Sequence, residues 1–280
     1  MFCLNLCEIL SPEGSLPISV PTLLEEFRAE GIKQPIERIY LGSSFCSQYF
    51  LHTYFWTNIL NLCKTYSLPV TLTLPIFSEK DLVNGKKKIA DILQLDSQVD
   101  EITVNDAGMA LYIKENYPKL HLNLGRLFFK AARDIRVDGY YRASFAHPCG
   151  REMASEFGAD GIELDLTHEK VTTTFGESSG NILTVAFHGP FCYQTTGNIC
   201  KFASIHRELD QKFRPNSPCT AECRHIAECN VKLNQGTVLY RIGRTVYFYV
   251  PNYSEYLTEG DRFIYFPARE LLGIGREGQP

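Results

Sequence analysis

Short apolar runs alternate with longer amphipathic segments along most of the chain. The apolar runs end in turn-forming residues and predict β-strands, whereas apolar residues at helical spacing predict helices between them. The strands expected from this pattern are residues 36–41, 70–77, 101–104, 121–124, 161–166, 182–187 and 263–266. The helices expected are residues 46–66, 80–95, 107–116 and 151–157.

Strands that alternate with helices are typical of βαβ units and of a parallel sheet. Six predicted strands precede residue 190 and a seventh lies near the end of the chain, which suggests a barrel related to the eight-stranded kind. The fold class predicted is therefore α/β, a TIM-like βα barrel. The pattern leaves open whether this barrel is complete or distorted.

One segment departs from the alternation. Residues 192–229 show little periodicity, and residues 237–251 then alternate apolar and polar positions around Gly243 and Arg244, as a β-hairpin does. An antiparallel hairpin does not belong to a parallel barrel. We expect one βα-barrel domain over residues 1–280, with residues 189–255 inserted as a cysteine-rich loop and a β-hairpin.

Composition and charge exclude several classes of protein. The 280 residues are 44% hydrophobic and 21% charged, as in an ordinary globular protein. The net charge of -4 has the wrong sign for a general binder of nucleic acid or of anionic membranes. No apolar stretch approaches 18 residues, so no membrane span is expected. Motifs of serine hydrolases, zincins and P-loop proteins are absent from the sequence.

The first residues bear on the cellular compartment. No Lys or Arg precedes Arg28, and Glu8 interrupts the initial apolar run, so this stretch does not resemble a secretory signal. We therefore expect a cytoplasmic protein. In a reducing cytosol, cysteines are more often metal ligands or redox groups than disulfides.

Cysteines are concentrated in the segment without periodicity, which holds five of the ten. Cys219 and Cys223 form a C-x3-C pair, Cys200 lies 19 residues before it, and a fourth ligand has to come from Cys192, Cys229 or a distant residue. Soft thiolates suit an iron–sulfur cluster, which needs several of them at one point. A structural zinc site with four cysteines, or unligated thiols packed as small apolar groups, would also fit.

Cys46 is the distant residue that topology favours. It follows Gly42 at the end of a predicted strand, and ligands of βα barrels gather where strands end. Cys46 could thus meet the cysteine-rich loop across the mouth of the barrel. Cys63 and Cys149 fall at helix ends and are expected to be buried.

Six short motifs, in this order along the chain, resemble the collagenase-like "U thirty-two" peptidase family. They are YLGSSFCS (40–47), EITVNDAG (101–108), NLGRLF (123–128), GIELDL (161–166), AFHGPFC (186–192) and CTAECR (219–224). Within that family, the cysteine pattern is most similar to the UbiV-type iron–sulfur branch.

The resemblance implies a 4Fe–4S cluster held by Cys46, Cys200, Cys219 and Cys223. It also implies a non-peptidase component of an oxygen-independent hydroxylation, as in ubiquinone biosynthesis, which acts with a paralogous partner in a hetero-oligomer. Cys192 follows His188-Gly189, as a ligand or candidate ligand does in other branches, so Cys192 could replace Cys46. Two alternatives remain. The family name implies a peptidase, and the cysteines are also compatible with a binding module that is stabilised by zinc.

Arg126, Asp165 and His188 are the candidates for substrate binding, because each stands at the end of a predicted strand. Glu163 and Asp165 alternate with apolar residues, so both carboxylates face one side of their strand and could act as an acid–base pair. His188 could instead donate a proton or a hydrogen bond to a cluster sulfur. The structural alternatives are an ion pair between a carboxylate and a nearby arginine, and a core histidine.

Overall fold

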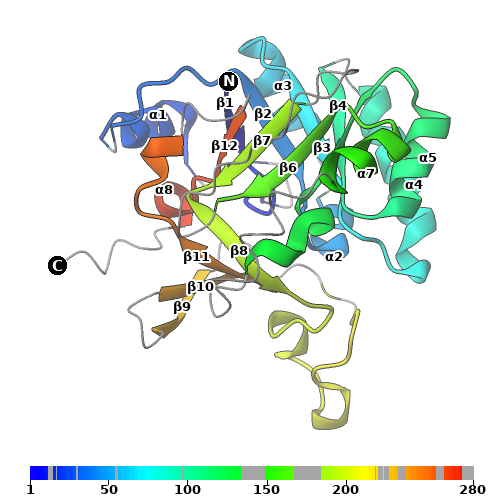
Figure 1. Ribbon diagram of the computed structural model, residues 1–280. Coiled ribbons are helices and arrows are strands. Elements are labelled where there is room, and N and C mark those ends of the chain that lie inside the picture. The colour runs from blue at the N-terminus through cyan, green and yellow to red at the C-terminus, as the bar shows by residue number, and fades with distance from the viewer. Residues whose placement is uncertain are drawn as a thin grey trace.

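The computed structural model describes residues 1–11, 15–16, 18–29, 31–53, 56–95, 98–133, 149–166, 184–217, 219, 223, 227–232, 238–256 and 262–272. Eight strands of this part of the chain close into a barrel (Figure 1). They are β1 (Phe2–Asn5), β2 (Arg38–Gly42), β3 (Val70–Thr73), β4 (Val99–Val104), β5 (His121–Leu124), β6 (Gly161–Asp165), β7 (Thr184–Gly189) and β12 (Arg262–Tyr265). All neighbours are parallel, and pairing of β1 with both β2 and β12 completes the ring.

Helices connect the strands. They are α1 (Val20–Ala29), α2 (Ser47–Leu51), α3 (Trp56–Thr65), α4 (Glu79–Leu95), α5 (Ala107–Asn116), α7 (Cys149–Phe157) and α8 (Ala268–Leu272). Short 3-10 turns are η1 (Arg126–Arg133), η2 (Phe202–Ser204), η3 (Leu209–Gln211) and η4 (Tyr253–Tyr256). Asp106 caps α5, since its Oδ1 accepts a hydrogen bond from the Met109 N–H at 2.9 Å.

The strands are buried on both sides, but the two sides differ in character. Along β2, Ile39 and Leu41 belong to the large hydrophobic core, whereas Arg38 and Tyr40 alternate with them and form polar contacts. Because side chains alternate along a strand, the apolar set packs against the helices and the polar set fills the barrel. The interior is thus unusually polar for a barrel that branched apolar residues commonly fill.

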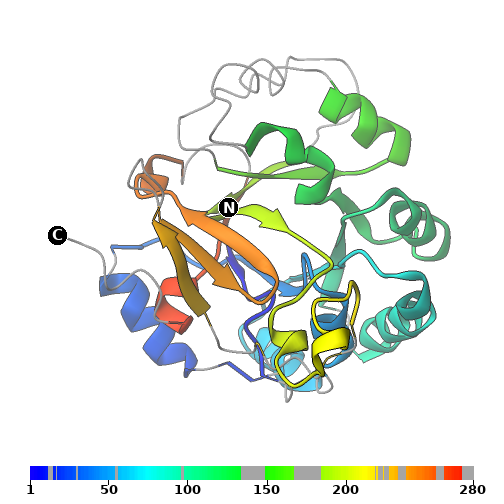
Figure 2. The same ribbon diagram turned by 90° about the horizontal axis from the view of Figure 1, so that it is seen from below.

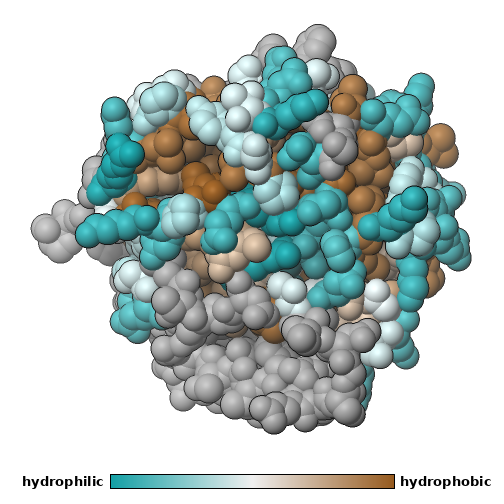
Figure 3. All heavy atoms as spheres, turned by 90° about the horizontal axis from the view of Figure 1, so that it is seen from above, coloured by the Kyte–Doolittle hydropathy of each residue, from teal (hydrophilic) through white to brown (hydrophobic). Residues whose placement is uncertain are grey.

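The two ends of the barrel differ. At the amino-terminal end of the strands, Arg38 Nη1 binds Asp100 Oδ1 at 2.7 Å, and hydrophilic residues cover much of the middle of that face (Figure 3). At the carboxyl-terminal end, a second sheet lies across the barrel (Figure 2). Its strands are β8 (Phe191–Thr196), β9 (Ala227–Lys232), β10 (Val238–Ile242) and β11 (Thr245–Tyr249), in the order β8-β11-β10-β9.

The predicted α/β barrel is confirmed, and so is the hairpin, since β10 and β11 pair antiparallel around Gly243 and Arg244. Several features differ from the prediction, among them α1 and α8, which lie in stretches to which the pattern assigned no element. The eighth strand is β1, in a stretch to which the pattern assigned no element, and β8 and β9 lie in the segment that showed little periodicity. The helix expected over residues 46–66 is two helices, α2 and α3.

No helix in the described part of the chain is long and apolar enough to span a membrane.

Candidate functional site

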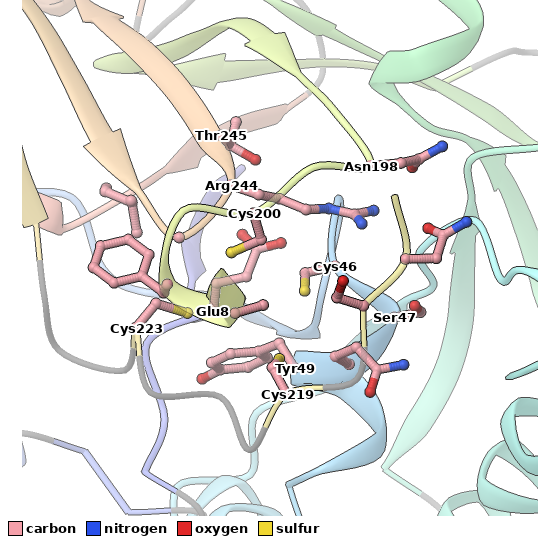
Figure 4. Close-up of a pocket in the computed structure, with 17 residues that line it drawn as sticks. Glu8, Cys46, Ser47, Tyr49, Asn198, Cys200, Cys219, Cys223, Arg244 and Thr245 are labelled. Carbon is pink, nitrogen blue, oxygen red and sulfur yellow. The ribbon is translucent and has the colours of Figure 1, made fainter. Parts of the chain in front are cut away.

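A cavity opens at the carboxyl-terminal end of the barrel, between the end of β2, the segment after β8 and the tip of the β10–β11 hairpin (Figure 4). Its volume is about 730 Å³, including the solvent in its mouth. Four cysteines line it, namely Cys46, Cys200, Cys219 and Cys223. Strand ends are where βα barrels place their sites, so the location agrees with the fold.

The local fold of residues 43–46 brings Cys46 to the cavity. β2 ends at Gly42, whose φ of +110° and close approach to the backbone of Thr73 exclude a side chain. The chain then turns, and the Cys46 N–H donates to Ser43 Oγ at 2.8 Å. Cys46 directly precedes α2, with an extended backbone at the helix start.

The other three cysteines come from the segment between β8 and β9. Cys200 lies just before η2, where its carbonyl oxygen accepts a hydrogen bond from Ser204 Oγ at 3.0 Å. Cys219 and Cys223 lie on the far side of the cavity, and the Cys223 sulfur is close to the hairpin tip, where a Cβ on Gly243 would be 3.5 Å from it. Segments far apart in sequence thus bring their thiols to one place.

Electrostatics show that these sulfurs interact. Burial raises the pKa of the Cys223 thiol, and the sulfurs of Cys46, Cys200 and Cys219 raise it further. Burial also raises the pKa of Cys46, while the Arg244 guanidinium lowers it and Cys200 raises it. The Cys223 thiol thus lies close to the other three, and a bound cation would neutralise the negative charge of such a donor set.

The residues present fit an iron–sulfur cluster by chemistry, since such clusters are held by four thiolates. Arg244 adds a positive charge at the same cavity. Within the described residues, no group of three or more His, Cys, Asp or Glu side chains is arranged to hold a single metal ion.

Four of the six remaining cysteines carried an expectation: Cys192 and Cys229 as alternative ligands, and Cys63 and Cys149 as buried residues. Cys192 is fully buried in β8, its Sγ contacts the His188 carbonyl oxygen at 3.4 Å, and it is not among the residues that line the cavity. Cys63 is buried in α3, as expected. The side chains of Cys149 and Cys229 lie outside the described part of the structure.

Arg126 and Asp165 lie below the cavity and do not line it. Arg126 Nη1 and Asp165 Oδ1 form an ion pair at 3.1 Å, with 2% and 0% of their side chains exposed. The Arg126 guanidinium also donates to Ser44 Oγ at 2.9 Å and lies 4.7 Å from the centre of the Phe45 ring. The pair therefore supports the floor of the cavity. It is the buried ion pair that the sequence left open as an alternative, and it does not contact a ligand in the cavity.

His188 lies inside the barrel, away from the cavity lining. Its Nε2 is 2.8 Å from Glu163 Oε2, and Glu163 Oε1 accepts from Thr103 Oγ1 at 2.5 Å. The face shared by Glu163 and Asp165 is the barrel interior, where each carboxylate has a different partner. The structure thus shows a core histidine paired with a buried acid, and His188 does not line the cavity that holds the four cysteines.

The free energy of unfolding is expected to depend on pH through the ionisation of Glu163. Burial raises the pKa of Glu163 to about 8, well above its ordinary value of 4.5. The folded protein therefore holds a proton that the unfolded chain releases. The stabilisation that results from this proton is full below pH 4.5 and is lost as pH rises toward 8. Its slope is at most ~1.4 kcal/mol per pH unit.

Glu163→Gln removes the titrating group, so we expect stability to fall less between pH 5 and pH 8 than in the wild type. Urea unfolding across this range measures the effect, with Glu115→Gln on the exposed face of α5 as the control. If the free energy of unfolding changed with pH equally in the wild type and in Glu163→Gln, the raised pKa of Glu163 would be contradicted.

Two charged residues at the cavity were not predicted as site residues from the sequence. Glu8 follows β1, and Arg244 sits at the hairpin tip, and both line the cavity. Glu8 adopts a left-handed backbone with φ of +64°, which is unusual for a residue with a side chain. The position of Arg244 in a turn was the only available signal, since neither residue belongs to a recognisable motif.

Comparisons with models of protein families, with curated proteins and with solved structures find no match to this chain. Its function therefore has to be argued from the site itself.

Proposed function

We propose that this protein binds a 4Fe–4S cluster through Cys46, Cys200, Cys219 and Cys223 at the carboxyl-terminal end of its barrel. One observation carries the proposal, namely that four thiols from separate segments line the same cavity. Chance burial would not be expected to gather thiols from residue 46 and from residues 200–223 at a single strand-end site.

The bound cluster would supply one-electron transfer at a potential set by burial, nearby charge and hydrogen bonds to its sulfurs. The chain provides the surroundings. Arg244 brings a positive charge to the cavity, and Phe45, the residue before Cys46, packs against the buried Arg126–Asp165 pair. Polar side chains such as Asn198 and Gln48 also line the cavity.

The biological role that we propose rests on the resemblance to the UbiV-type branch of the collagenase-like peptidase family. That role is a component of an oxygen-independent hydroxylation that acts with a paralogous partner. The positions of the resembling motifs support it. YLGSSFCS contains Cys46 and CTAECR contains the C-x3-C pair, so two of the six motifs supply three of the four cavity cysteines.

Zinc is the alternative occupant with a specific basis, because four cysteines are also a structural zinc set. Structural zinc sites, however, have four ligands that converge on one ion, whereas no group of three or more such side chains among the described residues is arranged around a single ion. A cysteine peptidase is less favoured. It needs a thiolate beside a histidine, and the described lining residues include no histidine.

Metal analysis together with an anaerobic absorption spectrum tests the proposal. Protein purified without oxygen is expected to contain about four iron atoms per chain and to be brown, because iron–thiolate and iron–sulfide charge transfer absorbs visible light. Zinc thiolates have no such absorption. Stoichiometric zinc in colourless protein, or absence of both metals, would reject the cluster.

A further inference from the structure

Glu8 and Arg244 both form hydrogen bonds with the segment that carries Cys46. Glu8 Oε1 accepts hydrogen bonds from the Phe45 N–H at 3.0 Å and from Ser43 Oγ at 2.7 Å. Ser43 Oγ in turn accepts from the Cys46 N–H at 2.8 Å. One carboxylate oxygen therefore holds the backbone on the amino-terminal side of Cys46, directly and through a serine.

Arg244 holds the next peptide group, which joins Phe45 to Cys46. Its Nε donates to the Phe45 carbonyl oxygen at 2.7 Å, and its Nη2 donates to the same oxygen. Two donors in one planar group fix both the distance and the direction of the carbonyl, which a single flexible ammonium would not do. The carbonyl carbon that is fixed in this way is bonded to the nitrogen of Cys46.

The Phe45 side chain completes the restraint. Its ring centre lies 4.6 Å from that of Tyr193, and the Arg126 guanidinium lies 4.7 Å from it. The N–H, the C=O and the ring of Phe45 are thus all engaged, so the residue before Cys46 has little freedom to move.

The hairpin tip links this restraint to the other side of the cavity. Arg244 follows Gly243, which lies next to the Cys223 sulfur, so one two-residue turn touches the surroundings of both Cys46 and Cys223. β10 and β11 are paired from Leu239–Phe248 to Ile242–Thr245, and this regular pairing makes the tip a defined support.

We propose that Glu8 and Arg244 are positioning residues that preset Cys46 relative to Cys223 for cluster binding, with the hairpin tip as the spacer. This inference rests on the proposed 4Fe–4S site. It concerns residues that were not among the predicted ligands and that hold Cys46 through backbone contacts. Such outer-sphere contacts commonly govern how tightly a metal group is retained.

The test measures cluster retention in anaerobically purified protein. Arg244→Met and Glu8→Ala remove the contacts, and each is expected to lose visible absorption to an iron chelator ~10-fold or more faster than the wild type. Glu8→Gln keeps an acceptor oxygen and should stay close to the wild type. Arg244→Lys keeps the charge but not the planar pair of donors, so it should also lose the cluster faster.

Reduction potentials separate positioning from charge. We expect Arg244→Met to lower the potential, because a positive charge stabilises the reduced cluster, whereas Arg244→Lys should leave it near that of the wild type. Arg241→Lys is the matched control, since Arg241 lies on the same hairpin and does not line the cavity. Thermal unfolding of each variant identifies a general loss of fold. If Arg244→Met does not fold, cluster retention in Arg244→Lys tests the positioning role.

Equal retention in the wild type, Arg244→Lys, Arg244→Met and Glu8→Ala would overturn the positioning role while leaving the cluster proposal intact. A wild-type protein without iron would instead reject the cluster proposal itself. The two failures are therefore distinguishable.

Discussion

Cys219→Ala and Cys223→Ala are each expected to abolish the brown colour and most of the iron of anaerobically purified protein. Both thiols line the cavity, and the Cys223 sulfur interacts with those of the three other lining cysteines. A cluster held by four thiolates has no spare ligand among the described lining residues, so loss of one exposes iron to solvent. Iron content and the absorption spectrum measure the effect.

Cys192→Ala is the matched control, because Cys192 is buried in β8 and does not line the cavity. It should keep its iron, whereas Cys46→Ala should lose it. The same comparison decides which of Cys46 and Cys192 is the fourth ligand. Full iron and colour in both Cys219→Ala and Cys223→Ala would reject the ligand assignment.

Arg126→Met is expected to lower the free energy of unfolding by about 3–5 kcal/mol, because it leaves the Asp165 carboxylate buried without its cation. The pair is almost fully buried, and Asp165 also accepts a hydrogen bond from the Tyr193 N–H at 3.1 Å. Urea unfolding followed by circular dichroism measures the loss. Replacement of both partners, in Arg126→Met with Asp165→Leu, should recover part of it, since no uncompensated charge then remains.

His121→Gln provides the contrast. His121 and Asp160 lie 3.7 Å apart with more than half of each side chain exposed, so its effect should stay within ~0.5 kcal/mol. A similarly small effect for Arg126→Met would show that the buried pair contributes little, and that the floor of the cavity does not depend on it.

Local signals explain why much of the barrel was predictable. The helix over residues 107–116 and the strand over residues 121–124 agree with α5 and β5 to the residue, because Asp106 caps the helix and Gly125 follows the strand. β1 escaped because four residues with two-sided burial show neither alternation nor a helical period. Its identity depends on pairing with β2 and β12, which is a tertiary property.

The candidate site was predictable only in part, for a similar reason. The C-x3-C pair and the strand end before Cys46 are local features, and they sufficed to expect thiols at the barrel mouth. Glu8 and Arg244 form hydrogen bonds with the backbone of Phe45, from which they are 37 and 199 residues away in the sequence. No rule based on residue spacing predicts contacts at such separations. Arg126, Asp165 and His188 were expected at strand ends, but whether they face the cavity or the barrel interior depends on packing.

Closure of the barrel by its first and last strands has a consequence for biosynthesis. β1 is synthesised before its neighbour β12, and the cysteine-rich segment lies between them. At ordinary rates of translation, the nascent β1 waits on the order of tens of seconds with one edge unpaired. The barrel therefore closes only after all four cysteines of the cavity have been made, and chaperones would protect the open edge of β1 until then.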